Sequence, residues 1–243
     1  MDASNRYREL ALRAQHRNDA QFTRFVDPAE QNQIRAAANA ADVQAAFYGG
    51  YPDAERCIAA FYRDFPPETF PIQAVEIRWN VKFASVGHRD LMGAVMALGL
   101  ERETLGDICI GQEEGSAYVF CTPEMADYLI GALESAGRAS VRTGYAKEIK
   151  IAPPEGREMR VTIQALRLDA VLAAGWNLSR SEAQKLIAAG LVKLNHVQEM
   201  RADRKIEASS LISARGYGRM RIDAVEGETR RGRLAVRVFK YGK

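Results

Sequence analysis

The chain has 243 residues, of which 47% are hydrophobic and 27% are charged, so it has enough apolar residues for more than one buried core. It contains no run of eighteen apolar residues, and MDASNRYREL lacks the basic and then apolar order of a signal peptide, which argues against a membrane span and secretion. Three scattered cysteines and three distant histidines argue against a disulfide framework and a zinc site. We therefore expect a cytoplasmic protein that holds no metal and no other cofactor.

The net charge of +3 hides a difference between the two parts of the chain. Residues 159–243 carry 17 Lys and Arg against 8 Asp and Glu, a net charge of +9, which leaves −6 for residues 1–158. A basic segment at the end of an acidic chain favours a polyanionic partner, and nucleic acid is the commonest one. From charge alone, a solvated basic surface without a partner is the alternative.

Residues 1–70 predict a mostly helical N-terminal domain. RYRELALRAQH has helical spacing, Asp27-Pro28 favours a helix start, and AEQNQIRAAANAADVQAAF is rich in helix-forming residues. FYGGYPDAER interrupts the pattern, and we interpret Gly49-Gly50 and Pro52 as a plain turn into another helix. A glycine turn before a helix can hold a phosphate, but no G-x-x-x-x-G-K-[ST] motif is present.

Residues 71–150 predict a middle domain with the order β-α-β-β-α-β. The six segments in turn are AVEIRWNVKF, HRDLMGAVMALGL, DICI, AYVFC, TPEMADYLIGALESAG and ASVRT. In the second helix, Thr122 is expected as the N-terminal cap and Gly137 follows the helix end. Ferredoxin-like folds and RNA-recognition motifs share this order. Tyr118 and Phe120 alternate where an RNA-recognition motif carries base-stacking aromatics, but the rest of that signature is missing. We therefore predict that both rings are core residues.

Residues 151–158, which include Pro153-Pro154, predict a linker to a basic domain over residues 159–243. That domain begins with an edge-like strand in which Met159, Val161 and Ile163 alternate with polar residues. RLDAVLAAG then predicts a helix with an apolar face, ended by Gly175.

The segment SRSEAQKLIAAGLVKLN predicts a second short helix followed by a strand. Ser179 and Glu182 form an S-x-x-E capping box, an apolar stripe follows, and Gly190 suits the end of the helix. The other side is polar and carries Arg180, Ser181, Gln184 and Lys185, which we expect a partner to cover. The strands LVKLN, LISA, YGRMRID and RLAVRVF follow, and their outward basic residues are Lys193, Arg215, Arg219 and Arg221.

RLDAVL, LSRSEAQKLIAAGLVKLN and RGYGRMRI, in this order between Arg167 and Ile222, resemble the S4 domain, an RNA-binding fold named for a small-subunit ribosomal protein. The family usually has Gly-Asp before its third strand, where this chain has Ala208-Ser209-Ser210. The resemblance implies an RNA-binding face formed by Arg167, Ser179, Arg180, Ser181, Gln184, Lys185, Lys193 and Asn195, with Arg215 and Arg219 on later strands. We add Arg221 as an outward basic residue of the same strand as Arg219.

FVDPAEQ, FYGGYPDAER, GHRDLMGAVMALGLERETLGDI, ADYL and GRASV resemble the N-terminal and middle regions of the YlmH family. That family places a small N-terminal domain and an RNA-recognition-motif-like domain before an S4 domain, which implies an α+β fold class. The resemblance also implies a bacterial or cyanobacterial cytoplasmic protein that binds ribosomal RNA, transfer RNA or both, and we expect it to be a monomer. Its expected setting is ribosome-associated quality control, on large subunits that still carry peptidyl-tRNA. Some relatives carry a photosystem II label, and others have genes beside cell-division genes.

An RNA-modifying enzyme is the alternative class, because S4 domains also occur in pseudouridine synthases, tyrosyl-tRNA synthetases and RNA methyltransferases. Residues 71–150 offer no glycine-rich cofactor loop and are too few for a synthase fold with a catalytic Asp. Gly87-His88-Arg89-Asp90 superficially resembles a catalytic motif, but Asp90 is expected to cap a helix. We therefore predict no catalytic residue. A cell-division adaptor that binds proteins through its acidic domains is the third class.

Overall fold

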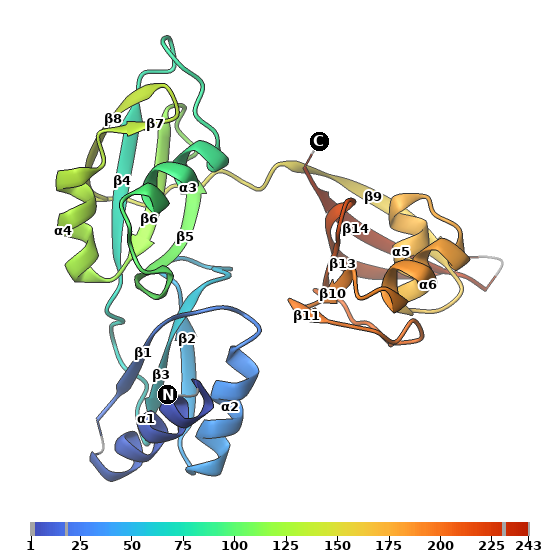
Figure 1. The fold of residues 1–243 in the computed structure, drawn as a ribbon. Coiled ribbons are helices and arrows are strands. Elements are labelled where there is room, and N and C mark those ends of the chain that lie inside the picture. Colours follow the sequence, from blue (N-terminus) through green and yellow to red (C-terminus); the bar gives the residue numbers. More distant parts are fainter. Residues whose placement is uncertain (1–2, 18, 230–231, 243) are drawn as a thin grey trace. The chain divides into compact units, whose positions relative to one another are not determined.

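The computed structural model describes residues 3–17, 19–229 and 232–242. The chain divides into two compact units, Met1–Pro153 and Pro154–Lys243. Each unit combines helices with antiparallel sheet (Figure 1), so the predicted α+β fold class is confirmed.

The first unit begins with helix α1 (Ala3–Arg17) and contains helix α2 (Gln31–Ala40). Strands β1 (Gln21–Val26), β2 (Gln44–Tyr48) and β3 (Cys57–Tyr62) form an antiparallel sheet in the order β1-β3-β2. The helical start agrees with the sequence prediction, but the sheet was not predicted. The prediction of a helix after FYGGYPDAER is wrong, because the residues that follow this turn form strand β3.

Strand β3 is buried on both of its faces, which explains why its sequence has no alternation. Ala59 and Phe61 pack with α1 and α2, whereas Ile58 packs in a second cluster on the other side of the sheet. A short continuous apolar run such as CIAAF suits a strand covered on both faces equally well as a helix. The local sequence left the structure of this segment open, and burial on both faces agrees with a strand.

The rest of the first unit has the predicted βαββαβ order, with a short hairpin added. It consists of β4 (Gln73–Trp79), α3 (His88–Ala97), the 3₁₀ turn η1 (Arg102–Thr104), β5 (Leu105–Ile110), β6 (Ser116–Cys121), α4 (Pro123–Ala132), β7 (Ser135–Ala136) and β8 (Ala139–Tyr145). The antiparallel sheet has the order β5-β6-β4-β8-β7. Helix α4 ends at Ala132, and Gly137, expected just after that helix, instead turns the β7–β8 hairpin with a φ of 60°. Its left-handed conformation is the one that glycine adopts without steric cost.

The two sheets of the first unit pack against each other through aromatic side chains. Phe25 and Ile58 of the N-terminal sheet share a cluster with Tyr118 and Phe120, which are only 3% and 0% exposed. The ring of Tyr51 stacks on that of Phe120, with centroids 4.9 Å apart. The prediction that Tyr118 and Phe120 are core residues is confirmed, because the N-terminal sheet covers the face on which an RNA-recognition motif would stack bases.

The FYGGYPDAER segment is a turn held by Asp107 of β5. The Asp107 carboxylate accepts hydrogen bonds from the Tyr51 hydroxyl at 2.9 Å and from the backbone N–H of Glu55 at 2.7 Å. Burial raises the pKa of Asp107, although these hydrogen bonds act to lower it. Gly50 has a φ of 99°, and a Cβ there would lie 2.3 Å from the Phe120 ring. The prediction of a plain turn is confirmed, and since β3 follows it, no helix N-terminus is present to bind a phosphate.

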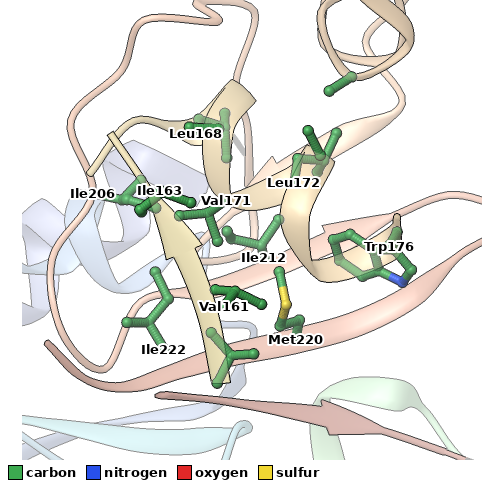
Figure 2. Close-up of a cluster of buried hydrophobic side chains, with 14 of the residues drawn as sticks. Val161, Ile163, Leu168, Val171, Leu172, Trp176, Ile206, Ile212, Met220 and Ile222 are labelled. Carbon is green, nitrogen blue, oxygen red and sulfur yellow. The ribbon is translucent and has the colours of Figure 1, made fainter. Parts of the chain in front are cut away.

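In the described part of the second unit, two helices lie on a six-stranded antiparallel sheet (Figure 1). Its elements are β9 (Gly156–Ile163), α5 (Leu168–Trp176), α6 (Arg180–Ala188), β10 (Val192–Leu194), β11 (Val197–Gln198), β12 (Leu211–Ala214), β13 (Gly218–Glu228) and β14 (Leu234–Tyr241). The sheet order is β11-β10-β12-β13-β14-β9, so β9 is an edge strand, as predicted. Figure 2 shows Val171 and Leu172 of α5 beside Ile212 and Met220 in the core between helices and sheet.

Helix α5 extends one residue past Gly175, at which the prediction ended it. Asn177 caps it in the left-handed conformation with a φ of 54°, whereas Gly175 lies inside the helix. A Cβ at Gly175 would lie 2.3 Å from the Met220 sulfur, so glycine permits α5 to approach β13 closely. The prediction of a structural role for Gly175 is therefore right, but the role is close packing against Met220 and not the end of the helix.

Candidate nucleic-acid interface

Asp169, in the first turn of α5, organises the polar side of the two helices. Its side chain is 0% exposed and accepts hydrogen bonds from three side chains that the sequence assigned to the binding face. Arg167 donates from Nε at 3.2 Å and from Nη2 at 3.1 Å, Arg180 donates from Nη2 at 2.7 Å, and Gln184 donates from Nε2 at 3.0 Å. One carboxylate therefore joins the start of α5 to the first and second turns of α6.

The ionised form of Asp169 is favoured in the folded protein. Burial acts to raise its pKa, but hydrogen bonds from Arg180, Gln184 and Arg167 outweigh burial and hold the pKa below its ordinary value. The Arg167 and Arg180 side chains are still 38% and 47% exposed, so their guanidinium groups are anchored on one side and open to solvent on the other. Such anchored donors suit phosphate and 2′-hydroxyl groups, because little side-chain entropy remains to be lost on binding.

Ser181 and Lys185 extend this surface along α6, and both are exposed. Ser179, by contrast, has a local structural role: its Oγ accepts from the Glu182 N–H at 3.2 Å, and the Glu182 carboxylate accepts from the Ser179 N–H at 2.8 Å. The predicted capping box is confirmed. Gly190, with a φ of 70°, follows the helix in the left-handed conformation that was expected there.

The residues expected on the strands lie on a different side of the unit. Strand β10 is joined to β11 by a tight hairpin in which Asn195 and His196 have φ values of 48° and 69°. The Asn195 Oδ1 accepts from the Leu211 N–H at 2.8 Å, so this amide also supports the fold. In β12 and β13, the side chains of Ile212, Ala214, Met220 and Ile222 are buried toward the helices. Since side chains alternate along a strand, Lys193, Arg219 and Arg221 point to the opposite side of the sheet. Arg215 lies in the turn after β12 and is exposed.

Two aromatic side chains of β14 accompany these basic residues. The Arg219 guanidinium carbon lies 5.2 Å from the centroid of the Tyr241 ring, and that of Arg221 lies 5.8 Å from the centroid of Phe239. Arg221 also donates from Nε to Asp223 at 2.8 Å. The predicted binding residues therefore form two groups rather than one face. We call Arg167, Arg180, Ser181, Gln184 and Lys185 the helix surface, and Lys193, Arg219, Arg221, Phe239 and Tyr241 the sheet surface.

Asp169, Phe239 and Tyr241 were missed by sequence reasoning. Asp169 stands in RLDAVL two residues after Arg167, and an acidic residue among predicted RNA-binding cations was a usable signal. Phe239 and Tyr241 alternate on the closing strand, as aromatics on one face of a strand do.

The departure from the S4 pattern before β12 is accommodated locally. Ser209 adopts a φ of 66°, the left-handed conformation that the glycine of the family would adopt without strain. The Ser210 Oγ then accepts from the Glu207 N–H at 3.1 Å. The substitution changes the chemistry of this turn and leaves the sheet register intact.

Asp90 lies at a helix start, as predicted, where its Oδ2 accepts from the Gly87 N–H at 2.9 Å. Among the described residues, no helix is long and apolar enough to span a membrane.

Comparisons with known proteins identify relatives of this chain. Family models match residues 1–64 (“YlmH, N-terminal”), 66–149 (“Putative RNA-binding domain in YlmH”) and 166–198 (“S4 domain”). The ribosome-associated protein quality control protein P2 of Bacillus subtilis (strain 168) is 34% identical over 220 residues, which covers 88% of this chain and 85% of that protein. The solved structure of cell division protein ylmH from Streptococcus pneumoniae matches 58% of this chain and 87% of its own, with 23% identity and a TM-score of 0.48.

The C-terminal fold and its basic surfaces define the class as RNA-binding proteins with an S4 domain. Within that class, the chain belongs to the YlmH family.

Proposed function

We propose that this protein binds structured ribosomal or transfer RNA through its S4 domain and acts by occupancy, without catalysing a reaction. The observation that carries the proposal is the arrangement of Arg167, Arg180 and Gln184 around the buried Asp169 carboxylate. Donors held in this way match the closely spaced phosphates and 2′-hydroxyls of A-form RNA, which are recognised by shape more than by sequence.

The proposed setting is the cytoplasmic large ribosomal subunit that retains peptidyl-tRNA. The name of the Bacillus subtilis relative supports association with the ribosome and a role in quality control, and the match covers most of both chains. We further propose a monomer with domains at residues 1–70, 71–150 and 159–243 and a linker at 151–158, although residues 156–158 already belong to strand β9. Tethered domains that each contact one assembly weakly gain affinity together through their high effective concentration.

Lys185→Glu in the full chain tests the helix surface. Lys185 is exposed on α6 and is not among the donors to Asp169, so its reversal leaves the buried carboxylate in place. Arg180→Glu is a poorer test, because it would set a second carboxylate against Asp169. Arg8→Glu on α1 is the matched control, since it makes the same class of charge reversal on an exposed residue of the first unit.

We expect Lys185→Glu to weaken binding to a structured RNA about tenfold at low salt and to reduce the salt dependence by about one counterion, with Arg8→Glu close to wild type. Co-sedimentation with large ribosomal subunits should fall in parallel. Equal binding by Lys185→Glu and wild type would refute the helix surface as the RNA site. A change in the mass of RNA incubated with the protein would refute action by occupancy.

A further inference from the structure

The sheet surface has a geometry that the helix surface lacks. Lys193, Ser213 and Arg219 are register partners on β10, β12 and β13. The Arg219 guanidinium lies over the Tyr241 ring of the neighbouring strand β14, so the four side chains form one row across these strands. Three strand spacings make this row about 14 Å long. The row begins with the Lys193 ammonium group, continues with the Ser213 hydroxyl and the Arg219 guanidinium, and ends with the Tyr241 ring.

The Tyr241 ring at the end of the row is fixed on several sides. Phe239 packs against it edge to face, with centroids 5.0 Å apart and an interplanar angle of 82°. Arg219 lies over the ring, and Arg221 Nη1 is 3.5 Å from the Tyr241 hydroxyl. Tyr241 is partly exposed, and Arg219 is exposed. A positioned aromatic ring beside cations is what proteins use to stack an unpaired base and neutralise its phosphates.

Charge favours a polyanion as the occupant of this face. Lys193, Arg219 and Arg221 are accompanied by Asp223, which pairs with Arg221, and by Glu158, which lies opposite Phe239 in the register. The end of the sheet that carries Lys193, Arg219 and Tyr241 is therefore its basic end. A duplex presents phosphates without accessible base faces, whereas the ring offers a contact that only an unpaired base can use.

We propose that the sheet surface is a second RNA site, separate from the helix surface, which binds a single-stranded segment with one base stacked on Tyr241 and its phosphates beside Arg219 and Lys193. This inference rests on the proposed function and deepens it, because it assigns structured RNA to the helices and unpaired nucleotides to the sheet.

The test compares full-chain variants on two probes, a short oligouridylate and a perfectly paired RNA duplex, by fluorescence anisotropy. Tyr241→Leu removes the ring, and Tyr241→Phe is its matched control because it keeps the ring and loses only the hydroxyl. Arg219→Gln removes the cation and keeps both rings, which covers the case in which Tyr241→Leu unfolds. Lys185→Glu reports on the helix surface in the same assay.

We expect Tyr241→Leu to weaken oligouridylate binding about fivefold or more and duplex binding less than about twofold, with Tyr241→Phe near wild type. Arg219→Gln should also bind oligouridylate more weakly, whereas Lys185→Glu should mainly affect the duplex. In Tyr241→Trp, the added indole fluorescence should be quenched when oligouridylate binds.

Three results would overturn the inference alone: a wild type that binds the duplex and not oligouridylate, a folded Tyr241→Leu that binds oligouridylate normally, or equal losses on both probes. If folded Tyr241→Leu lost ribosomal co-sedimentation with oligouridylate binding unchanged, the sheet surface would be a protein-docking face instead. A wild type that binds neither probe would refute the proposed function as well.

Discussion

Replacing Asp169 by Asn should destabilise the S4 unit far more than a surface substitution does. The change keeps the shape of the side chain and replaces the charged carboxylate, which accepts four hydrogen bonds from Arg167, Arg180 and Gln184, by a neutral amide. Breaking a buried ion pair costs about 3–5 kcal/mol. Here the two guanidinium groups are 38% and 47% exposed and can be rehydrated, so we expect a smaller loss of about 2–3 kcal/mol.

That loss corresponds to a fall in Tm of about 10–20 °C for a unit of this size. The assay is urea and thermal unfolding followed by tryptophan fluorescence. The chain has two tryptophans, Trp79 in the first unit and Trp176 at the end of α5. A Trp79→Phe background therefore leaves Trp176 as a reporter of the S4 unit alone.

Asp203→Asn is the matched control, because it makes the same chemical change at a carboxylate that is 59% exposed and 3.6 Å from Arg201. We expect it to change the stability by less than about 0.5 kcal/mol. If Asp169→Asn had an equally small effect, the carboxylate would not organise the helix surface, and the argument from its burial would fail.

Three further predictions concern pH, the interface between sheets and a turn. Asp169 has a pKa in the folded protein below its unfolded value of about 3.9. The stability that its ionised form contributes to the folded protein is therefore present above that value and is lost as the pH falls through the folded pKa. The loss of stability below about pH 4 should be steeper in wild type than in Asp169→Asn. Phe120→Ala should destabilise the first unit by about 3–5 kcal/mol in Trp79-monitored urea unfolding, since the ring is fully buried, and a loss below about 1 kcal/mol would contradict that packing. His196→Gly should stabilise the S4 unit by about 0.5–1 kcal/mol, because His196 has a φ of 69° in a two-residue hairpin where Asn-Gly is favoured; a lower unfolding midpoint would contradict this.

Local signals in the sequence predicted much of the fold. The Ser179 and Glu182 capping box, the left-handed Gly190 and the alternation in β9 each depend on a few adjacent residues, and the structure has all three. The N-terminal sheet was not predictable in this way, because β3 is a short continuous apolar run, buried on both faces, that has no alternation to distinguish a strand from a helix. Gly175 shows the same limit: its role depends on Met220, which is distant in the sequence.

The sequence predicted which types of residue form the candidate site, but it did not predict how they are arranged in space. The cations of the helices and strands were identified, but the sequence treated them as one face. Their division depends on which side of the sheet α5 and α6 cover, a property of the tertiary fold. Asp169 was overlooked because an acidic side chain opposes RNA binding unless it is buried and paired, and burial is not visible in the sequence.

The packing of the N-terminal sheet over Tyr118 and Phe120 has a practical consequence for dissecting this protein. A fragment that begins after the N-terminal sheet would expose both rings, together with Ile72 and Phe70, on an open sheet face. Such a fragment would aggregate, or would stack nucleotides on aromatic rings that the intact chain buries. RNA binding measured on that fragment would therefore be a false positive, created by the truncation itself.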